Sequence, residues 1–224
     1  MPVKLRLAED SDIPRIAESA LAAFESDPLH MAMLPREHTN HIMEWYQGRL
    51  RSALSDPNMR SIVAVDSRQD ADGVKEIIAG YSRWLLPSKS SEANNAVENE
   101  RPAAAFPELA NKPLVDFYLQ QSDDKRGKQM DKSRDVVLYV LATDPAYQGQ
   151  GIGRMMLEWG INTAATLAES GQNTKPRILL EATPLAYPIY KKFGWKDYES
   201  ITIDLKQYGI ANGTEHTTVC MIRE

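Results

Sequence analysis

The stretch of sequence that decides the fold lies between residues 138 and 154. It reads Leu138-Tyr139-Val140-Leu141-Ala142-Thr143-Asp144-Pro145-Ala146-Tyr147-Gln148-Gly149-Gln150-Gly151-Ile152-Gly153-Arg154. The apolar run at its start is typical of a strand that is covered on both faces. The glycines that follow allow backbone N–H groups to converge on one point, and a helix beginning near Ile152 would add partial positive charge there. This unit therefore predicts a binding site for a phosphate or pyrophosphate.

Two common phosphate-binding loops do not fit this stretch. A Walker loop requires Gly-Lys followed by Ser or Thr, which is absent here. The dinucleotide-binding pattern G-x-G-x-x-G would place a glycine where Arg154 stands. The loop must belong to another class of anion site.

Outward from this unit, hydrophobic periodicity predicts alternating strands and helices. We expect strands over residues 3–7, 61–65, 77–86, 136–141, 177–180 and two more at the C-terminal end, with helices over 13–24, 39–55, 152–167 and 185–193. The strands on either side of the polar turn at 70–73 should pair antiparallel. The chain is thus expected to form a single α/β domain over residues 1–224.

Residues 87–134 interrupt this pattern. The segment is rich in Ser, Asn, Ala, Pro and charged residues, and only residues 114–119 are amphipathic. We interpret it as an insertion that carries one helix and contributes little to the core. The sequence leaves open whether it is a passive surface loop or a functional lid.

Composition narrows the classes of partner and compartment. The 224 residues are 42% hydrophobic and 25% charged, with a formal net charge of −5, so no global positive field attracts nucleic acid or an anionic membrane. The first ten residues lack the apolar core of a signal peptide, and no stretch approaches the roughly 20 apolar residues of a membrane span. A single cysteine, Cys220, allows no internal disulfide and no multi-cysteine metal site. We expect a cytoplasmic protein, with the nucleus also possible, that binds neither nucleic acid nor membranes.

Three motifs together resemble one protein family. Gln148, Gly151 and Gly153 match the Q/R-x-x-G-x-G/A signature of the GNAT superfamily of acetyltransferases. The stretches Leu179-Leu180-Glu181-Ala182-Thr183-Pro184 and Tyr187-Pro188-Ile189-Tyr190-Lys191-Lys192-Phe193-Gly194-Trp195 resemble the strand and the helix end that follow in that family. They look closest to small-molecule N-acetyltransferases of the puromycin-acetylating kind.

The resemblance implies a fold and a co-substrate. The fold would be a mixed, mostly antiparallel sheet flanked by helices on both faces. Acetyl-CoA would lie in a central cleft, and no metal is implied. Its pyrophosphate would bind the loop and its pantetheine arm the preceding strand, through Leu141, Ala142, Thr143, Gln148, Gly149, Gln150, Gly151, Ile152, Gly153 and Arg154.

Two residues are candidates for catalytic groups, one from the resemblance and one from its place at the end of a strand that faces the cleft. Tyr190 occupies the position of the family's general acid, which protonates the departing thiolate. It could instead only pack against the cofactor, and Tyr187 could substitute for it. Glu181 is the candidate base for the amine, or else a structural carboxylate.

The remaining polar candidates are weaker. His30, His38, His41 and His216 are more often surface or packing residues, and their spacing forms no metal motif. Cys220 reads as a small buried residue of a strand.

The implied reaction is direct acetyl transfer to a primary amine, and we expect that amine to belong to a small molecule. The alternatives are a protein or peptide amine, or a CoA-binding regulatory module without turnover. The sequence does not distinguish a monomer from a homodimer.

Overall fold

A computed structural model of the chain describes residues 3–35, 39–70, 73–88, 107, 110–169 and 176–224. Its centre is one seven-stranded sheet in the order β1-β2-β3-β4-β5-β7-β6. Only β4 and β5 are parallel, and every other neighbouring pair is antiparallel. The strands are β1 Lys4–Leu7, β2 Met59–Asp70, β3 Gly73–Leu85, β4 Val136–Thr143, β5 Ile178–Ala182, β6 Lys196–Asp204 and β7 Glu215–Arg223. The predicted mixed, mostly antiparallel sheet is confirmed.

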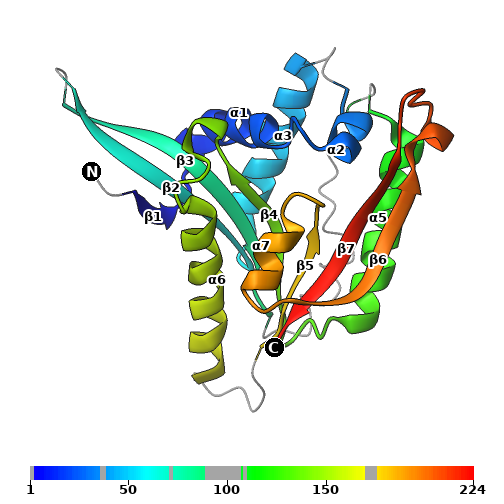
Figure 1. Cartoon of the computed structure of the whole chain (residues 1–224). Helices are drawn as coiled ribbons and strands as arrows, with labels where there is room; N and C mark the ends of the chain where they lie inside the picture. The colour runs from blue at the N-terminus through cyan, green and yellow to red at the C-terminus, as the bar shows by residue number, and fades with distance from the viewer. Residues whose placement is uncertain (1–2, 36–38, 71–72, 89–106, 108–109, 170–175) are drawn as a thin grey trace.

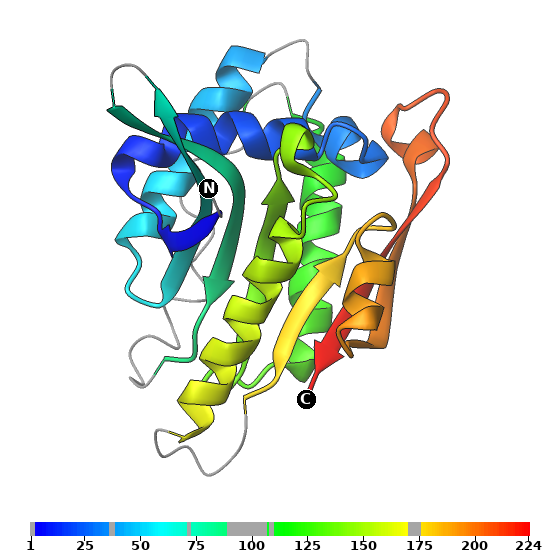
Figure 2. The same ribbon diagram turned by 60° about the vertical axis from the view of Figure 1, so that its left-hand side comes forward.

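Helices cover both faces of this sheet, also as predicted (Figures 1 and 2). The front face in Figure 1 carries α6 (Ile152–Glu169) and α7 (Tyr187–Lys192). The opposite face carries α1 (Ile13–Ala23), α3 (Thr39–Ser55) and α5 (Lys112–Gln129), with the short α2 (Pro28–Met33) beside α5. Among the described residues, no helix combines the length and the hydrophobicity needed to cross a membrane.

The hydrophobic core has separate parts on the two faces. Trp84, Leu138 and Leu180 pack with residues of α6 and α7 on the first face. On the second face, Val63 and Tyr81 pack with α1 and α3. Strand β4 supplies residues to both parts, because Leu138 belongs to the first cluster and Val140 packs against the second. This explains why its sequence is a continuous apolar run.

The hairpin of β2 and β3 is longer than its sequence pattern predicts. Backbone pairing continues from Asp66↔Ile77 to Asp70↔Gly73, beyond the apolar residues, and Figure 1 shows this end projecting from the sheet. Residues there are mostly polar, so hydrophobic alternation did not mark them as strand. Helix α2 was also missed, because six residues are too few to show a helical period.

Helix α5 corrects the expectation that residues 87–134 contribute little to the core. Its Leu114 and Val115 are fully buried, and Leu114 packs with Ile201, Ile203 and Cys220 of β6 and β7. Residues 89–106 and 108–109 lie outside the described part of the chain. The choice between a functional lid and a passive surface loop concerns these residues and stays a prediction.

The contact between α6 and Trp84 gives a stability prediction. A Cβ atom added at Gly160 would lie 2.2 Å from the buried Trp84 ring. Alanine normally favours a helix over glycine by about 0.5–1 kcal/mol, but overpacking a core typically costs about 1–3 kcal/mol. We expect Gly160→Ala to lower the free energy of unfolding. At Gly48 in α3 an added Cβ meets nothing within 4 Å, so Gly48→Ala should raise it. Denaturant unfolding of both variants tests this, and equal effects would contradict it.

Candidate active site

The sheet opens between its two parallel strands. Strands β4 and β5 pair at only three positions, Val136↔Ile178, Val137↔Leu179 and Leu138↔Leu180. On the other side of β4 the register shifts, because Trp84 pairs with Leu138 and Arg83 with Val140. Tyr139 is thus the extra residue of a β-bulge, which bends the strand that carries it. The bulge lies where the pairing ends, so it accounts for the divergence of β4 from β5.

Beyond the bulge, one edge of β4 has no partner strand among the described residues. Leu141, Ala142 and Thr143 pair with Ser82, Tyr81 and Gly80 of β3, but their other edge faces the gap toward β5. This edge offers backbone N–H and C=O groups to an extended, amide-bearing ligand. These are the three residues expected to bind a pantetheine arm.

The glycine loop lies at the open end of this gap. Gly149 and Gly151 have φ values of 76° and 83°, the left-handed region that favours glycine. The first turn of α6 is closed by the N–H of Met155, which donates to the Gly151 carbonyl over 3.0 Å. The N–H groups of Ile152, Gly153 and Arg154 precede it at the positive end of an 18-residue helix. The loop thus has the geometry of an anion site.

The loop is fixed to the body of the protein at its start. Asp144 caps the short 3₁₀ helix Pro145–Tyr147 by accepting from the Ala146 N–H, 2.9 Å away, and its other oxygen pairs with Arg15 of α1. The side-chain amide of Gln148 donates to the Thr143 carbonyl over 3.3 Å. These contacts hold the loop in place before any ligand binds.

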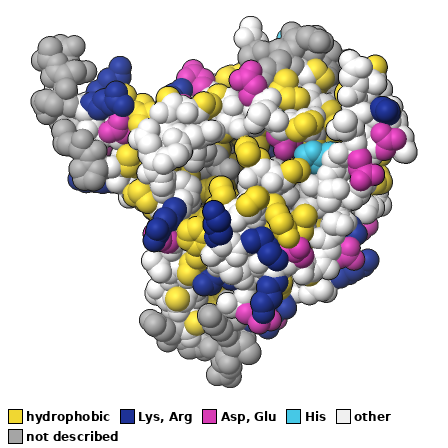
Figure 3. Space-filling view, in the orientation of Figure 1, with side chains coloured by type: hydrophobic (Ala, Val, Ile, Leu, Met, Phe, Trp, Pro, Cys, Tyr) yellow, Lys and Arg dark blue, Asp and Glu magenta, His cyan; other side chains and the backbone are white. Residues whose placement is uncertain are grey.

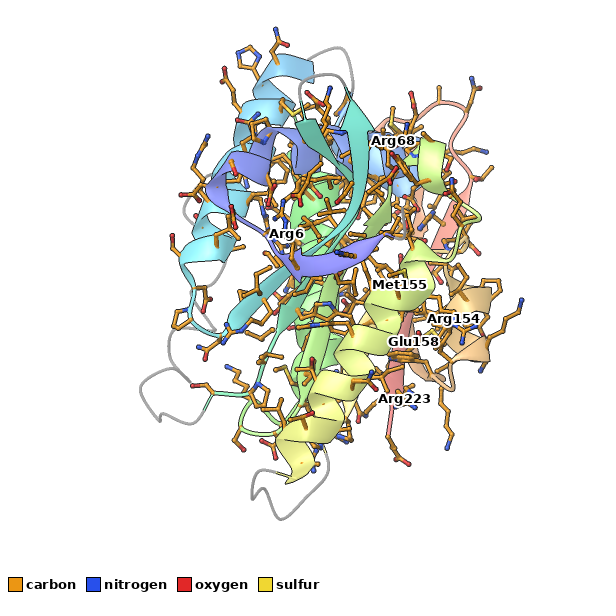
Figure 4. The ribbon with its side chains drawn as sticks, turned by 90° about the vertical axis from the view of Figure 1, so that its left-hand side faces the viewer. Arg6, Arg68, Arg154, Met155, Glu158 and Arg223 are labelled. Carbon is orange, nitrogen blue, oxygen red and sulfur yellow. The ribbon has the colours of Figure 1, made fainter. Side chains whose placement is uncertain are left out.

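The side chain of Arg154 is paired along α6 in this structure. Its guanidinium donates to Glu158 over 2.7 Å, one turn further along α6, and Figure 4 shows both on the same side of the helix. The side chain is 71% exposed, so it is free to turn toward a bound phosphate. The two Lys residues in the last turn of α7, Lys191 and Lys192, add to the basic side chains visible over this face in Figure 3.

Tyr190 lies on the α7 side of the opening. It is only 5% exposed and packs in the same cluster as Leu180, with its ring 5.8 Å from that of Trp195. Burial raises the pKa of its hydroxyl above the ordinary value of 10.0. The phenol is therefore held in the protonated form that a general acid requires.

Tyr187 is engaged elsewhere. Its hydroxyl donates to Asp197 over 2.8 Å, and Lys191 donates to the other oxygen of that carboxylate over 3.2 Å. The hydrogen bond to Asp197 raises the pKa of Tyr187. Tyr187 is thus directed to a surface carboxylate, whereas Tyr190 is buried beside the opening.

Glu181 follows Leu180, the last residue of β5 that pairs with β4, and forms a buried ion pair. Arg126 of α5 donates to the same Glu181 oxygen from Nη2 at 2.8 Å and from Nε at 3.0 Å. The two side chains are 9% and 12% exposed, and the guanidinium also lies 4.9 Å from the Tyr139 ring centre. The two hydrogen bonds hold this carboxylate against the guanidinium of α5, where it neutralises a buried positive charge. The geometry favours the structural alternative for Glu181, and sequence reasoning missed Arg126.

The histidines occupy diverse surroundings. His216 is buried beside Thr218, 3.4 Å away, and burial lowers its pKa. His30 stacks on Phe24 at 5.1 Å, His41 is exposed, and His38 lies outside the described residues. In the described ranges, no three His, Cys, Asp or Glu side chains are grouped to hold a metal ion. Cys220 is buried on β7, as a strand residue should be.

One cavity, of about 680 Å³, lies on another side of the loop. It is lined by Val3, Asp66, Ser67, Arg68, Ala146, Tyr147 and Gln150. Arg68, labelled in Figure 4, donates hydrogen bonds to the Asp66 carboxylate over 2.8 Å and to the Tyr147 hydroxyl over 3.0 Å. Gln150 is the one candidate residue in its lining, so we place the active site at the β4–β5 opening and not in this cavity.

Comparisons with known proteins agree with this architecture. Residues 115–197 match the family model of the acetyltransferase (GNAT) domain. A protein of Stachybotrys chartarum named acetyltransferase is 24% identical over 162 residues, which are 70% of this chain and 67% of that protein.

Solved structures show the same fold over nearly the whole chain. Arylalkylamine N-acetyltransferase 2 from Aedes aegypti superposes with a TM-score of 0.60 and 21% identity, covering 99% of this chain and 98% of that one. A polyamine N-acetyltransferase from Drosophila melanogaster that forms N-acetylagmatine superposes with a TM-score of 0.58 and 14% identity, covering 99% of both chains. The PaiA N-acetyltransferase of Thermoplasma acidophilum, solved with coenzyme A, gives 0.53 and 13%, covering 100% of this chain and 99% of that one. Residues 115–197 thus carry the match to the GNAT acetyltransferase domain, and the chain is an enzyme of the acetyltransferase class.

Proposed function

We propose that this enzyme transfers an acetyl group from acetyl-CoA to the primary amine of a small molecule. The observation that carries the proposal is the opening between β4 and β5 at the Tyr139 bulge, with the glycine loop at one end and Tyr190 beside it. The proposal includes the resemblance of residues 179–195 to small-molecule N-acetyltransferases of the puromycin-acetylating kind. Relatives in fold that act on an arylalkylamine and form N-acetylagmatine support a small amine as acceptor.

The residues at the opening fit acetyl-CoA. The N–H groups of the 148–154 loop would bind the pyrophosphate, with Arg154 close enough to add its charge. The unpaired edge of Leu141, Ala142 and Thr143 would pair with the pantetheine amides in the manner of an added strand. Both sets of backbone groups exist before binding, so little ordering is required of the protein.

The reaction needs few groups beyond this positioning. The neutral amine nitrogen attacks the acetyl carbonyl carbon, the C–S bond breaks, and the departing thiolate takes a proton from Tyr190. The nitrogen then releases its extra proton, which restores the Tyr190 phenol through water and leaves the neutral amide. A backbone N–H of β4 at the opening would stabilise the oxyanion. The amine must first lose a proton to water or to a base, for which Glu181 is the candidate from sequence. Holding amine and thioester together supplies the remaining rate enhancement.

Gly151 provides a test of the cofactor site. A β-branched residue at φ 83° resists the left-handed conformation by about 1–2 kcal/mol, so Gly151→Val should pull the loop out of shape. We expect CoA affinity to fall by about tenfold or more, since 1.4 kcal/mol corresponds to tenfold. Calorimetric titration with CoA measures the change.

Gly209 is a matched control for this variant. Its φ is also 83°, an added Cβ meets nothing within 4 Å at either glycine, and it follows the 3₁₀ helix Leu205–Tyr208, far along the chain from the loop. Gly209→Val should lose similar stability and keep its CoA affinity. If both variants, or neither, lost CoA affinity, the pyrophosphate would not be on this loop.

The acceptor class is tested by an amine screen. The enzyme is incubated with acetyl-CoA and single amines, and both free CoA release and the acetylated product's mass are measured. We expect product from one or more small primary amines. Product only with peptides would favour a protein acceptor, and CoA binding without any product would make the chain a binding module.

A further inference from the structure

Arg83 lies beside the opening of the sheet, and none of the described residues provides a counter-ion for its charge. It lies on β3, where it pairs with Val140 of β4, and its side chain is half-buried. Its Nε atom is buried and has no hydrogen-bond partner. In the described parts of the chain, Arg83 forms no ion pair with an acidic side chain. A buried charged donor without a partner is destabilising, so it calls for an explanation.

The surroundings of Arg83 are positively charged. Its guanidinium carbon lies 5.8 Å from the Tyr139 ring centre, and that of Arg126 lies 4.9 Å from the same ring. Glu181 balances the charge of Arg126, which leaves that of Arg83 uncompensated. Burial raises the pKa of Tyr46 of α3 to about 12, and the charges of Arg83 and Arg49 oppose that rise. One side of the opening therefore carries an excess of positive charge.

This positive region lies where an acceptor would arrive. Helices α6 and α7 cover one face of the sheet (Figure 2). The glycine loop leads into α6, and Tyr190 lies on α7. Tyr139 packs on the other face with Leu85, Val137 and Leu179, and Arg83 lies against its ring there. With acetyl-CoA on the α6 face, an acceptor would have to approach the bulge from the face that carries Arg83.

We propose that Arg83 binds an anionic group of the acceptor, so that the acceptor is a small amine that also carries a carboxylate. This inference rests on the proposed acetyl transfer and narrows its substrate class. The planar guanidinium presents paired N–H donors that match a carboxylate or a phosphate. A polyamine, whose second ammonium would face this charge, fits the region poorly.

Matched pairs of amines test the proposal. 4-Aminobutyrate and butylamine, and phenylalanine and phenethylamine, differ only in the carboxylate, whereas phosphoethanolamine and ethanolamine test a phosphate in its place. We expect kcat/KM of the wild-type enzyme to be at least about tenfold higher for the carboxylated member, which corresponds to one charged hydrogen bond. A preference confined to phosphoethanolamine would assign the site to phosphate and overturn the carboxylate.

Variants of Arg83 then connect this preference with the residue. In Arg83→Gln, the ratio of kcat/KM between the carboxylated amine and its partner should fall close to one. Arg83→Lys should keep part of the preference for the carboxylate. Arg51 on α3 is exposed, so Arg51→Gln should change neither ratio. Circular dichroism and calorimetry with CoA establish that each variant is folded and binds the co-substrate.

A binding measurement separates this proposal from acetyl transfer itself. The CoA-bound enzyme is titrated with 4-aminobutyrate and with butylamine by calorimetry, which needs no turnover. Tighter binding of 4-aminobutyrate that is lost in Arg83→Gln would support the anion site even if the transfer reaction failed. Equal binding of the two amines, or a preference that survives in a folded Arg83→Gln variant, would overturn it.

Discussion

Replacement of Tyr190 by phenylalanine is expected to lower kcat by about 10²–10⁴-fold, the usual contribution of a general acid. The substitution removes only the hydroxyl, so the ring keeps its packing against Trp195 at 5.8 Å. CoA affinity should therefore be unchanged. Steady-state kinetics with an acceptor from the screen, together with CoA titration, measures both quantities.

The matched control is Tyr187→Phe. That hydroxyl donates to Asp197, so its removal should change turnover by less than about threefold, the range in which we would not assign a proton donor. If Tyr187→Phe showed the large loss and Tyr190→Phe the small one, the acid would be Tyr187. A loss below threefold in both would assign protonation to water.

The pH profile gives a second expected result. Because burial raises the pKa of Tyr190 above 10.0, the phenol keeps its proton at every pH below that value. The acid form is lost only as pH rises through the raised pKa, so Tyr190 should cause no fall in rate between about pH 6 and 9. The ratio of wild-type to Tyr190→Phe rates should be constant over that interval. A ratio that declined steadily toward pH 9 would contradict the protonated phenol.

The parts of the fold that sequence predicted are those with a strong local pattern. The helix at 39–55 shows its apolar spacing within its own residues, and the glycine loop shows its conformation through Gly149 and Gly151. The β-bulge, in contrast, has no local pattern in the sequence. Tyr139 sits inside an unbroken apolar run, and its extra position exists only relative to the register of β3.

Partners that are distant in the chain were also invisible. Arg126 and Glu181 are 55 residues apart. The sequence predicted a helix around residues 114–119, but the polar residues that follow hid its extension to Arg126. One signal was present: Leu114, Tyr118, Ser122 and Arg126 follow one another at steps of four, which places them on one face of a helix. A buried arginine on that face requires a carboxylate elsewhere, but sequence does not say which one.

The pairing of these two residues leads to the second large effect, on stability. Glu181→Gln would leave the Arg126 guanidinium, 12% exposed, without its buried counter-charge. Breaking one partner of a buried pair typically costs about 3–5 kcal/mol, which for a chain of this length lowers the melting temperature by about 6–20 °C. Thermal unfolding followed by circular dichroism measures the loss. A shift of less than about 2 °C would mean that the pair contributes little to folding.

The double variant Glu181→Gln with Arg126→Met separates a structural Glu181 from a catalytic one. Removing both charges replaces the pair by side chains of similar volume, which is often neutral or stabilising, so the melting temperature should recover. A structural Glu181 predicts that turnover recovers with it, because the opening is again well packed and Tyr190 is untouched. A catalytic Glu181 predicts a stable enzyme whose turnover remains low. Because Glu181 accepts two hydrogen bonds from Arg126 on one oxygen, we expect the first outcome, with the amine losing its proton to water.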